Sequence, residues 1–336
     1  MVFLFSGFPY KFLRVSFYYV SIKESGLLQG RSTRRFLMNH KIISAASVPS
    51  RAGSRTGQRG ITETGLKWIA LASMLMDHIY YFFGYTNLIP WWFGLAGRLA
   101  APLFLFCLVE GFFHTGSRKR YFFKILCIAV PMGLLHFFMR FGNVFVRPDG
   151  FYPQNAMLSS FLILIVFFQA FEWVASRRLR KAAAGCGVLL ALLAWPFVAG
   201  ILSGANAVIA TAVGILGYTL LPVINISGDV TIPVLMTGIV LYLTHRNRKI
   251  QAAALAAVNF AWHFILVYLQ VRTWPGFTLS QMFTVYYEWM GAVFAVPFLL
   301  CYNSRRGAGH GKFFYVFYPA HIYILYALSW LLMAAA

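Results

Sequence analysis

The chain contains ten apolar runs, each close to the length that a helix needs to cross a membrane. They lie at about 66–85, 91–113, 121–139, 156–175, 183–201, 206–224, 229–244, 250–271, 279–302 and 313–334. A helix of about 20 apolar residues spans the hydrocarbon core of a bilayer. Charged residues make up 11% of the 336 residues, well below the roughly one quarter found in soluble domains. The pattern therefore predicts an all-α, polytopic transmembrane bundle of about nine to ten helices.

The N-terminal part has a different composition. Residues 23–60 are rich in Arg, Ser, Gly and Thr, contain almost no acidic residue and lack hydrophobic periodicity, as is typical of a segment that cannot bury a core. We expect residues 1–62 to form a basic, disordered cytoplasmic arm and residues 63–336 to form the transmembrane domain. Translation from Met38 is an alternative, in which residues 1–37 are not made.

Clusters of basic residues between the apolar runs predict the orientation of the bundle. These clusters are the arm and the turns that begin at Arg118, Arg177, Arg246 and Arg305. Basic clusters face the cytoplasm, and all of these reach it only if the chain crosses nine times, with the N-terminus inside and the C-terminus outside. One run between 183 and 244 is then re-entrant, interfacial or broken. We expect this to be the short run near Asp229, with 206–224 as the second candidate.

The net charge of +21 does not by itself indicate a nucleic-acid partner. The basic residues lie in short turns beside apolar runs, as expected for membrane topology and contact with anionic lipid. We therefore expect a lipid bilayer as partner and no nucleic acid. The four cysteines form no CxxC pair, and Walker A, GxGxxG and HExxH motifs are lacking. No metal site is predicted.

Ionisable residues interrupt the apolar runs, at a cost of about 2.5–3.5 kcal/mol for each Asp or Arg at the centre of a helix. Asp77 lies about 15 Å from the cytoplasmic end of the first run, and Arg98 about 10 Å from the outer end of the second. Because these runs cross in opposite directions, the two side chains reach similar depths and can pair. His321 and Glu288 fall about 12 and 14 Å from the ends of their runs. The four groups predict one polar cavity; a purely structural Asp77–Arg98 pair is the alternative.

A second set of polar residues lies near the cytoplasmic end of the second run. Glu110 and His114 are four residues apart and share one helix face. A turn of three basic residues, Arg118, Lys119 and Arg120, follows them. Cations at such a mouth suit the phosphates of coenzyme A, whose thioester would then reach inward. We interpret these five residues as a candidate cofactor-binding mouth.

Four blocks of polar and aromatic residues stand out in the transmembrane part. They are Leu66–His78, which ends in Asp-His, Gly97–Thr115, Gln154-Asn155, and Phe313–His321, which contains Phe-Tyr-Pro-x-His. Their content and order resemble the TraX family, bacterial membrane proteins implicated in N-terminal acetylation of conjugative pilin. The resemblance implies a multi-pass protein of the bacterial inner membrane that uses acetyl-CoA as acyl donor. The implied acceptor is a pilin-like N-terminus or a cell-surface molecule with an amine or hydroxyl.

The residues then take roles in a membrane-embedded acyltransferase. Acyl transfer requires a base for the proton of the acceptor and donors for the developing oxyanion. We expect His78 to be the base, oriented by Asp77 unless that carboxylate pairs with Arg98. Arg98 is expected to stabilise the oxyanion, His321 is the reserve base, and Asn155 is expected to cap the helix that follows it. A proton-coupled transporter and a non-catalytic scaffold for surface assembly are the alternatives.

Overall fold

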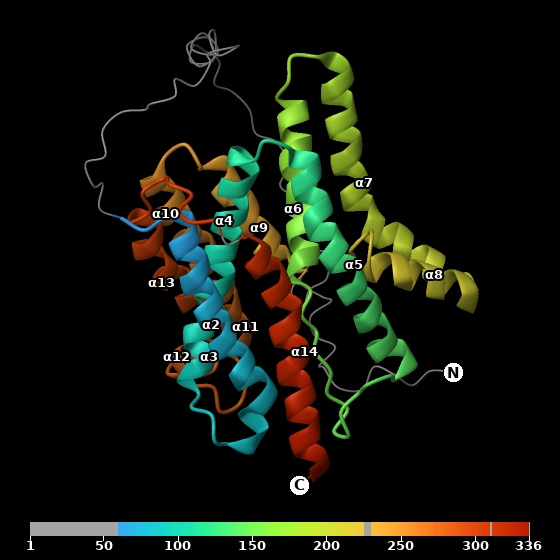
Figure 1. Ribbon diagram of the computed structural model, residues 1–336, viewed down its shortest axis with the longest axis vertical. Helices are drawn as coiled ribbons and strands as arrows, with labels where there is room; N and C mark the ends of the chain where they lie inside the picture. The colour runs from blue at the N-terminus through green and yellow to red at the C-terminus, as the bar shows by residue number, and fades with distance from the viewer. Residues whose placement is uncertain (1–59, 225–229, 310, 336) are drawn as a thin grey trace. The chain divides into compact units, whose positions relative to one another are not determined.

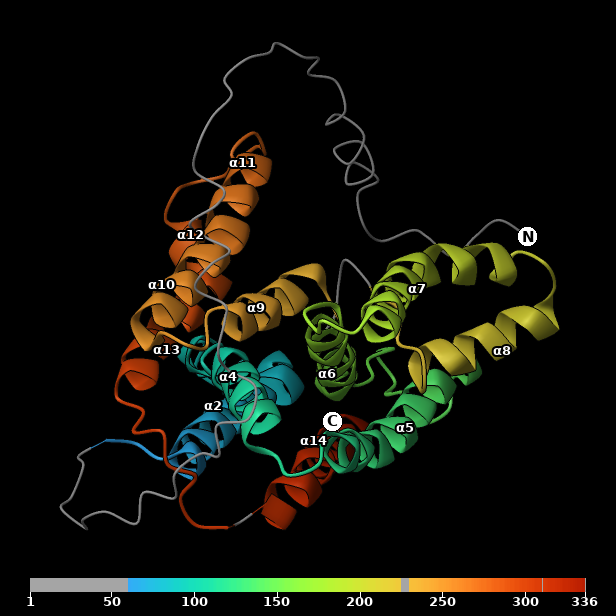
Figure 2. The ribbon, with the colours of Figure 1, turned by 90° about the horizontal axis from the view of Figure 1, so that it is seen from above.

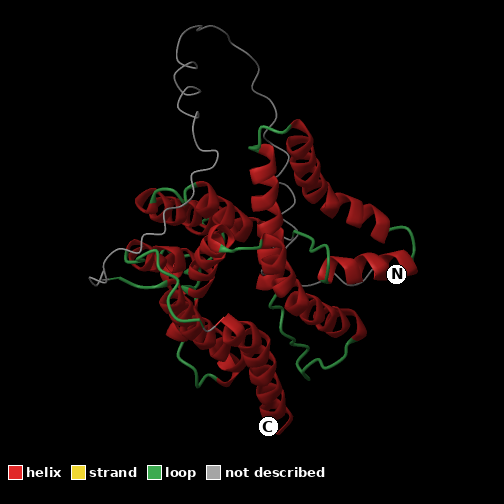
Figure 3. Cartoon of the chain, turned by 45° about the horizontal axis from the view of Figure 1, so that its top comes forward, coloured by secondary structure: helices red, strands yellow, loops and turns green. Residues whose placement is uncertain are grey.

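The computed structural model describes residues 60–224, 230–309 and 311–335 (Figure 1). In these ranges the elements are helices joined by loops (Figure 3), and an isolated parallel bridge pairs Ile61 with Tyr302. The predicted all-α fold is confirmed. The arm predicted at residues 1–62 lies outside the described residues except for its last three, as do the Met38 start and Asp229. The arm, the Met38 start and the break near Asp229 therefore stay predictions.

The helices follow one another with short connections. They are α2 (Glu63–Phe83), η2 (Gly84–Thr86), α3 (Trp92–Gly97), α4 (Ala100–His114), α5 (Arg118–Gly142), α6 (Met157–Val174), α7 (Leu179–Ser203), α8 (Ala207–Tyr218), α9 (Ile232–Leu243), α10 (Arg248–Asn259), the π-helix η3 (Phe260–Leu266), α11 (Val267–Val271), α12 (Gln281–Thr284), α13 (Glu288–Leu300) and α14 (Gly311–Ala335).

Six helical stretches of the described chain are long and apolar enough to cross a membrane. They are Trp92–His114, which combines α3 and α4, Arg118–Gly142, Met157–Val174, Leu179–Ser203, Arg248–Val271, which combines α10, η3 and α11, and Gly311–Ala335. The chain is therefore a multi-pass membrane protein. The expected nine to ten spans are not confirmed, because α8, α9 and α13 are shorter and α2 carries Glu63, Lys67 and Asp77.

The two segments predicted to contain a break are both short helices. α8 and α9 have 12 residues each. Each is therefore about 18 Å long, against about 30 Å for the hydrocarbon core. Neither crosses a bilayer alone. Which of the two departs from a full crossing, and which way the bundle is oriented, stay predictions.

Side-chain caps fix the starts of two helices that later supply walls of a cavity. The Thr62 hydroxyl accepts a hydrogen bond from the Gly65 N–H at 3.1 Å, at the start of α2. The Ser117 hydroxyl accepts one from the Arg120 N–H at 3.3 Å, at the start of α5. Each bond satisfies an N–H group of a first turn, which has no acceptor within its own helix.

Helix α4 lies in the interior of the bundle. It packs against α2, α6, α9 and α13, and the view from above shows it between α2, α6 and α9 (Figure 2). Its side chains Leu103, Phe106 and Phe112 are completely buried. Because lipid tails are as apolar as these side chains, close packing rather than water exclusion holds them in place. These four neighbouring helices are therefore positioned by contact with α4.

Helices α7 and α8 lie at the edge of the bundle. Large apolar side chains such as Leu190, Phe197 and Ile201 are exposed, as expected where a helix faces lipid. Small residues let membrane helices approach closely. A Cβ atom added at Gly133 of α5 would lie 1.7 Å from the carbonyl oxygen of Tyr218 at the end of α8. This glycine therefore permits the contact between α5 and α8.

We expect Gly133→Ala to destabilise the bundle by about 1–3 kcal/mol, because the added methyl group forces α8 away from α5. The measurement is the thermal unfolding midpoint of the purified protein in detergent. Gly187→Ala is the matched control, since nothing lies within 4 Å of a Cβ atom at that position of α7. Equal midpoints for the two variants would show that the α5–α8 contact does not contribute to stability.

Candidate functional site

The break between α3 and α4 sets the position of Arg98. α3 ends at Gly97 and α4 begins at Ala100. The carbonyl of Arg98 would normally accept from the N–H four residues later, but Pro102 has no N–H. The chain therefore turns at Arg98 instead of continuing as one regular helix.

Two glycines bring neighbouring helices against this turn. A Cβ atom at Gly97 would lie 2.2 Å from Cβ of Asp77 in α2. A Cβ atom at Gly291 of α13 would lie 2.2 Å from the carbonyl oxygen of Arg98. Because neither position leaves room for a methyl group, α2 and α13 approach Arg98 from two sides.

The Asp77–Arg98 pair expected from helix depths forms here. Arg98 Nη2 donates to Asp77 Oδ1 at 2.6 Å, and Arg98 Nε donates to the carbonyl oxygen of Gly94 at 3.2 Å. Nη1 of Arg98 has no hydrogen-bond partner among the described residues. The side chains of Arg98 and Asp77 are 35% and 23% exposed, so the pair is accessible from one side.

His78, the residue after Asp77, belongs to a separate hydrogen-bonded group. Its Nδ1 lies 2.6 Å from Nε2 of His321 in α14, and its Nε2 lies 2.8 Å from the side-chain nitrogen of Asn155. The first expectation, that Asp77 orients His78, is therefore wrong, because both ring nitrogens have other partners. The second expectation, that Asp77 pairs with Arg98, is confirmed.

The hydrogen-bond partners define which nitrogen carries the proton in each neutral ring. Nδ1 of His321 lies 2.8 Å from the carbonyl oxygen of Phe317, so this nitrogen must donate. Its Nε2 then accepts, and the Nδ1–H of His78 is the donor. Nε2 of His78 is left with a lone pair that accepts from the Asn155 amide. The two rings thus form an uncharged chain from Asn155 to a backbone carbonyl.

Asn155 does not cap α6, which corrects the sequence-based expectation. The residue at the cap position is Ala156, without a side-chain hydrogen bond. Asn155 instead ends the loop between α5 and α6 and points its amide at His78. Its Oδ1 is buried without a hydrogen-bond partner in the described residues. The sequence showed only that a polar residue precedes a helix and gave no signal for a partner in α2.

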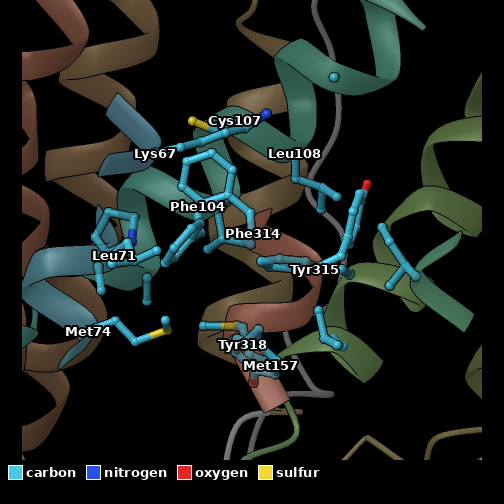
Figure 4. Close-up of a pocket in the computed structure, with 18 of the residues that line it drawn as sticks. Lys67, Leu71, Met74, Phe104, Cys107, Leu108, Met157, Phe314, Tyr315 and Tyr318 are labelled. Atoms are coloured by element: carbon cyan, nitrogen blue, oxygen red, sulfur yellow. The ribbon is translucent and has the colours of Figure 1, made fainter. Parts of the chain in front are cut away.

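A cavity of about 1930 Å³ joins these groups. Its polar lining includes Asp77, His78, Arg98, Asn155 and Glu288. Side chains of α2, α4, α6 and α14 face it, among them Lys67, Phe104, Met157 and Phe314 (Figure 4). The expected convergence on one cavity is therefore found for Asp77, Arg98 and Glu288. His321 is buried and reaches the cavity only through His78.

Basic side chains line the same cavity where α5 and α14 begin. They are Arg120, Lys124, Arg306 and Lys312, together with Lys67, which is paired with Glu63 at 2.5 Å. His114 also lies on the wall. The sequence does not separate these residues from the other basic residues near the turns, because a turn that faces the cytoplasm and a wall that faces a cavity have the same composition.

Of the five residues predicted to form a cofactor-binding mouth, the wall includes two, His114 and Arg120. Lys119 is exposed and lies off the wall. The guanidinium of Arg118 lies 4.2 Å from the centre of the Phe112 ring and 3.9 Å from the carboxylate of Glu172. This placement contradicts the mouth assignment of Arg118, because its charge is directed away from the cavity.

Glu110 likewise faces away from the cavity. Its carboxylate accepts from Nη1 of Arg248 at 3.0 Å and is 6% exposed. Arg248 also donates to Gln251 at 2.6 Å, and its guanidinium lies 4.7 and 4.8 Å from the ring centres of Phe106 and Tyr302. Ion pairing and cation–π contacts together satisfy this guanidinium. Glu110 therefore joins α4 to α10, which corrects its assignment to the mouth.

We expect Glu110→Ala to destabilise the protein by about 1–3 kcal/mol, because it leaves the half-buried Arg248 charge without its carboxylate partner. The measurement is thermal unfolding in detergent. The double variant Glu110→Ala/Arg248→Met should recover most of the loss, since it removes both charges. If Glu110→Ala were as stable as the wild type, the structural role would be wrong and the ligand-binding role predicted from the sequence would be favoured.

No group of three or more His, Cys, Asp or Glu side chains in the described ranges lies close enough to hold a metal ion. A family model described as TraX protein matches residues 62–329, which is most of the chain. No match to the chain is found among curated proteins or solved structures.

Proposed function

The chain belongs to the TraX protein family, and we propose that it is a membrane-embedded acyltransferase. The reaction moves an acetyl group from acetyl-CoA to an amine or hydroxyl acceptor. The observation that supports it most is that one cavity has on its wall both His78, the open end of the imidazole chain, and the guanidinium of Arg98. The same wall has cations without an ion pair among the described residues. Acyl transfer needs a base, an oxyanion donor and a site for an anionic donor molecule.

In this proposal, Nε2 of His78 is the base. The acceptor N–H or O–H replaces the Asn155 amide as donor to the lone pair of Nε2. His78 takes the proton as the acceptor attacks the thioester carbonyl, and the new positive charge is shared with His321 through the Nδ1–H bond. His321 therefore acts through His78 and is no longer a reserve base. The proton then passes to the departing thiolate, so that coenzyme A leaves as a thiol.

Arg98 is the proposed donor to the oxyanion. Its Nη1 has no partner among the described residues, so this group is free to bind the carbonyl oxygen of the thioester. Asp77 neutralises the guanidinium in the resting state, which lowers the cost of a charge inside the membrane. The donor and its counter-ion are thus preorganised before the acyl group arrives.

The phosphates of acetyl-CoA are proposed to bind where α5 and α14 begin. Arg120, Lys124, Arg306 and Lys312 line that part of the cavity, and none forms an ion pair with a described carboxylate. Cations attract phosphate strongly in a confined site. With the nucleotide held there, the acyl arm extends along the cavity toward His78 and Arg98.

The acceptor is proposed to be a pilin-like N-terminus or a cell-surface molecule, and the protein to act in the bacterial inner membrane during conjugation-related assembly. The hydrogen-bonded imidazoles also suit a proton-coupled transporter, because such chains conduct protons. Acetyl transfer by purified protein in detergent separates the two functions, since transport requires a sealed membrane.

We expect His78→Ala to lower acetyl transfer roughly a hundred- to ten-thousandfold, the usual contribution of a general base. The measurement is transfer of radiolabel from acetyl-CoA in membranes that contain equal amounts of protein. His136→Ala is the matched control, because His136 packs its ring against Tyr218 and is not on the cavity wall. Full activity in His78→Ala would remove His78 from the mechanism.

Arg98→Lys tests the oxyanion role and separates an enzyme from a scaffold. Lysine keeps the charge but lacks the planar fork that binds Asp77 and a carbonyl oxygen together. We expect kcat to fall roughly a hundred- to a thousandfold with unchanged protein level. A non-catalytic scaffold would tolerate both Arg98→Lys and His78→Gln in an assay of surface assembly.

A further inference from the structure

Arg147 is a buried arginine in the loop between α5 and α6. Its side chain is 4% exposed, although it lies outside the helices. Nε and Nη2 donate to the two oxygens of Asp149 at 2.8 and 2.6 Å. These hydrogen bonds hold the pKa of Asp149 below its ordinary value. The guanidinium is therefore paired in the bidentate geometry that arginine forms with a carboxylate.

The third nitrogen of Arg147 reaches two other helices. Nη1 donates to the carbonyl oxygen of Phe82 in α2 at 3.2 Å and to the hydroxyl of Ser329 in α14 at 3.4 Å. The rings of Tyr85 and Phe151 lie 4.6 and 4.4 Å from the guanidinium. Cation–π contacts of this kind are favourable for a desolvated arginine. One side chain thus contacts α2, α14 and its own loop.

Helix α14 holds the loop at further points. The Tyr326 hydroxyl lies 2.7 Å from the carbonyl oxygen of Phe145 and 3.0 Å from that of Phe151. The indole N–H of Trp330 donates to the carbonyl oxygen of Val146 at 3.3 Å. The backbone on both sides of Arg147 is therefore fixed to the same helix.

The elements that Arg147 connects are those that carry the imidazole chain. Phe82 lies about one helical turn after His78, and Ser329 about two turns after His321. The loop that Arg147 anchors leads directly into Asn155, the third member. No contact of Arg147 reaches these three residues themselves, so any effect on them must act through the backbone.

We propose that Arg147 is a positioning residue, which keeps Asn155, His78 and His321 in register by tying the α5–α6 loop to α2 and α14. The catalytic part of this inference rests on the proposed function. Without these contacts of Arg147, the loop moves, the Asn155 amide leaves Nε2 of His78, and the imidazole ring loses one of the two partners that orient it. Binding of the donor is unaffected, because Arg120 and Lys124 lie at the opposite end of α5 from this loop.

The variants are Arg147→Gln, which removes the charge, and Arg147→Lys, which keeps the charge but loses the fork. Arg272→Gln is the matched control, since Arg272 is an exposed loop arginine outside the ion pairs found in the described chain. Asn155→Ala provides the reference for a His78 ring that has lost its amide partner. If Arg147→Gln does not fold, Arg147→Lys alone tests whether Arg147 positions His78.

The decisive readout is the rate at which diethyl pyrocarbonate modifies His78 in the purified protein, followed by mass spectrometry of the peptide that contains it. We expect faster modification in both Arg147 variants, approaching that of Asn155→Ala, and the wild-type rate in Arg272→Gln. A wild-type rate in a folded Arg147 variant would overturn the proposal. This readout needs no acyl transfer, so it stands even if the proposed function fails.

The acetyl transfer assay then tests the catalytic consequence. We expect kcat to fall roughly ten- to a hundredfold in Arg147→Lys, as for a misplaced catalytic group, with an unchanged KM for acetyl-CoA. If the Arg147→Lys sample instead contained less active protein but kept the wild-type kcat, Arg147 would only support folding. Wild-type protein without any transfer activity, combined with faster His78 modification in the variants, would reject the enzyme but keep the positioning role.

Discussion

The cost of a charge in hydrocarbon is the constraint on which the arrangement of this bundle depends. Arg98 lies where α3 turns into α4, and Asp77 meets it at 2.6 Å. The pair can form because Pro102 interrupts the helix and because Gly97 and Gly291 leave room for α2 and α13. The turn that places the guanidinium also lies on the cavity wall, where Gly97, Arg98 and Pro102 are among the lining residues.

The cost of a charge in hydrocarbon also distinguishes polar groups that are paired within the bundle from polar groups that are free to bind a ligand. Glu110 and Arg248 satisfy each other in the bundle and leave nothing for a ligand. His78 and His321 satisfy each other without any net charge, so that a lone pair on His78 is available at little cost. Four of the cations that have no ion pair among the described residues, Arg120, Lys124, Arg306 and Lys312, lie on the cavity wall. This division is the physical basis for proposing acyl transfer.

Helical rise alone predicted the Asp77–Arg98 pair, because both residues sit in runs whose ends are marked by basic turns. The partners of Asn155 and Glu110 were not predictable in this way. Asn155 depends on the path of a loop fixed by Arg147, and Glu110 depends on Arg248, which follows it 138 residues later. The expected span count is not confirmed for a related reason, since the apolar run at 206–224 contains a helix only at Ala207–Tyr218.

The most direct test of a shared cavity is an experimental structure of the purified protein with acetyl-CoA bound. The account predicts phosphates beside Arg120 and Lys124, and a thioester oxygen within hydrogen-bond distance of Nη1 of Arg98 and on the same side as His78. A coenzyme bound elsewhere, or a thioester that does not reach Arg98, would contradict it.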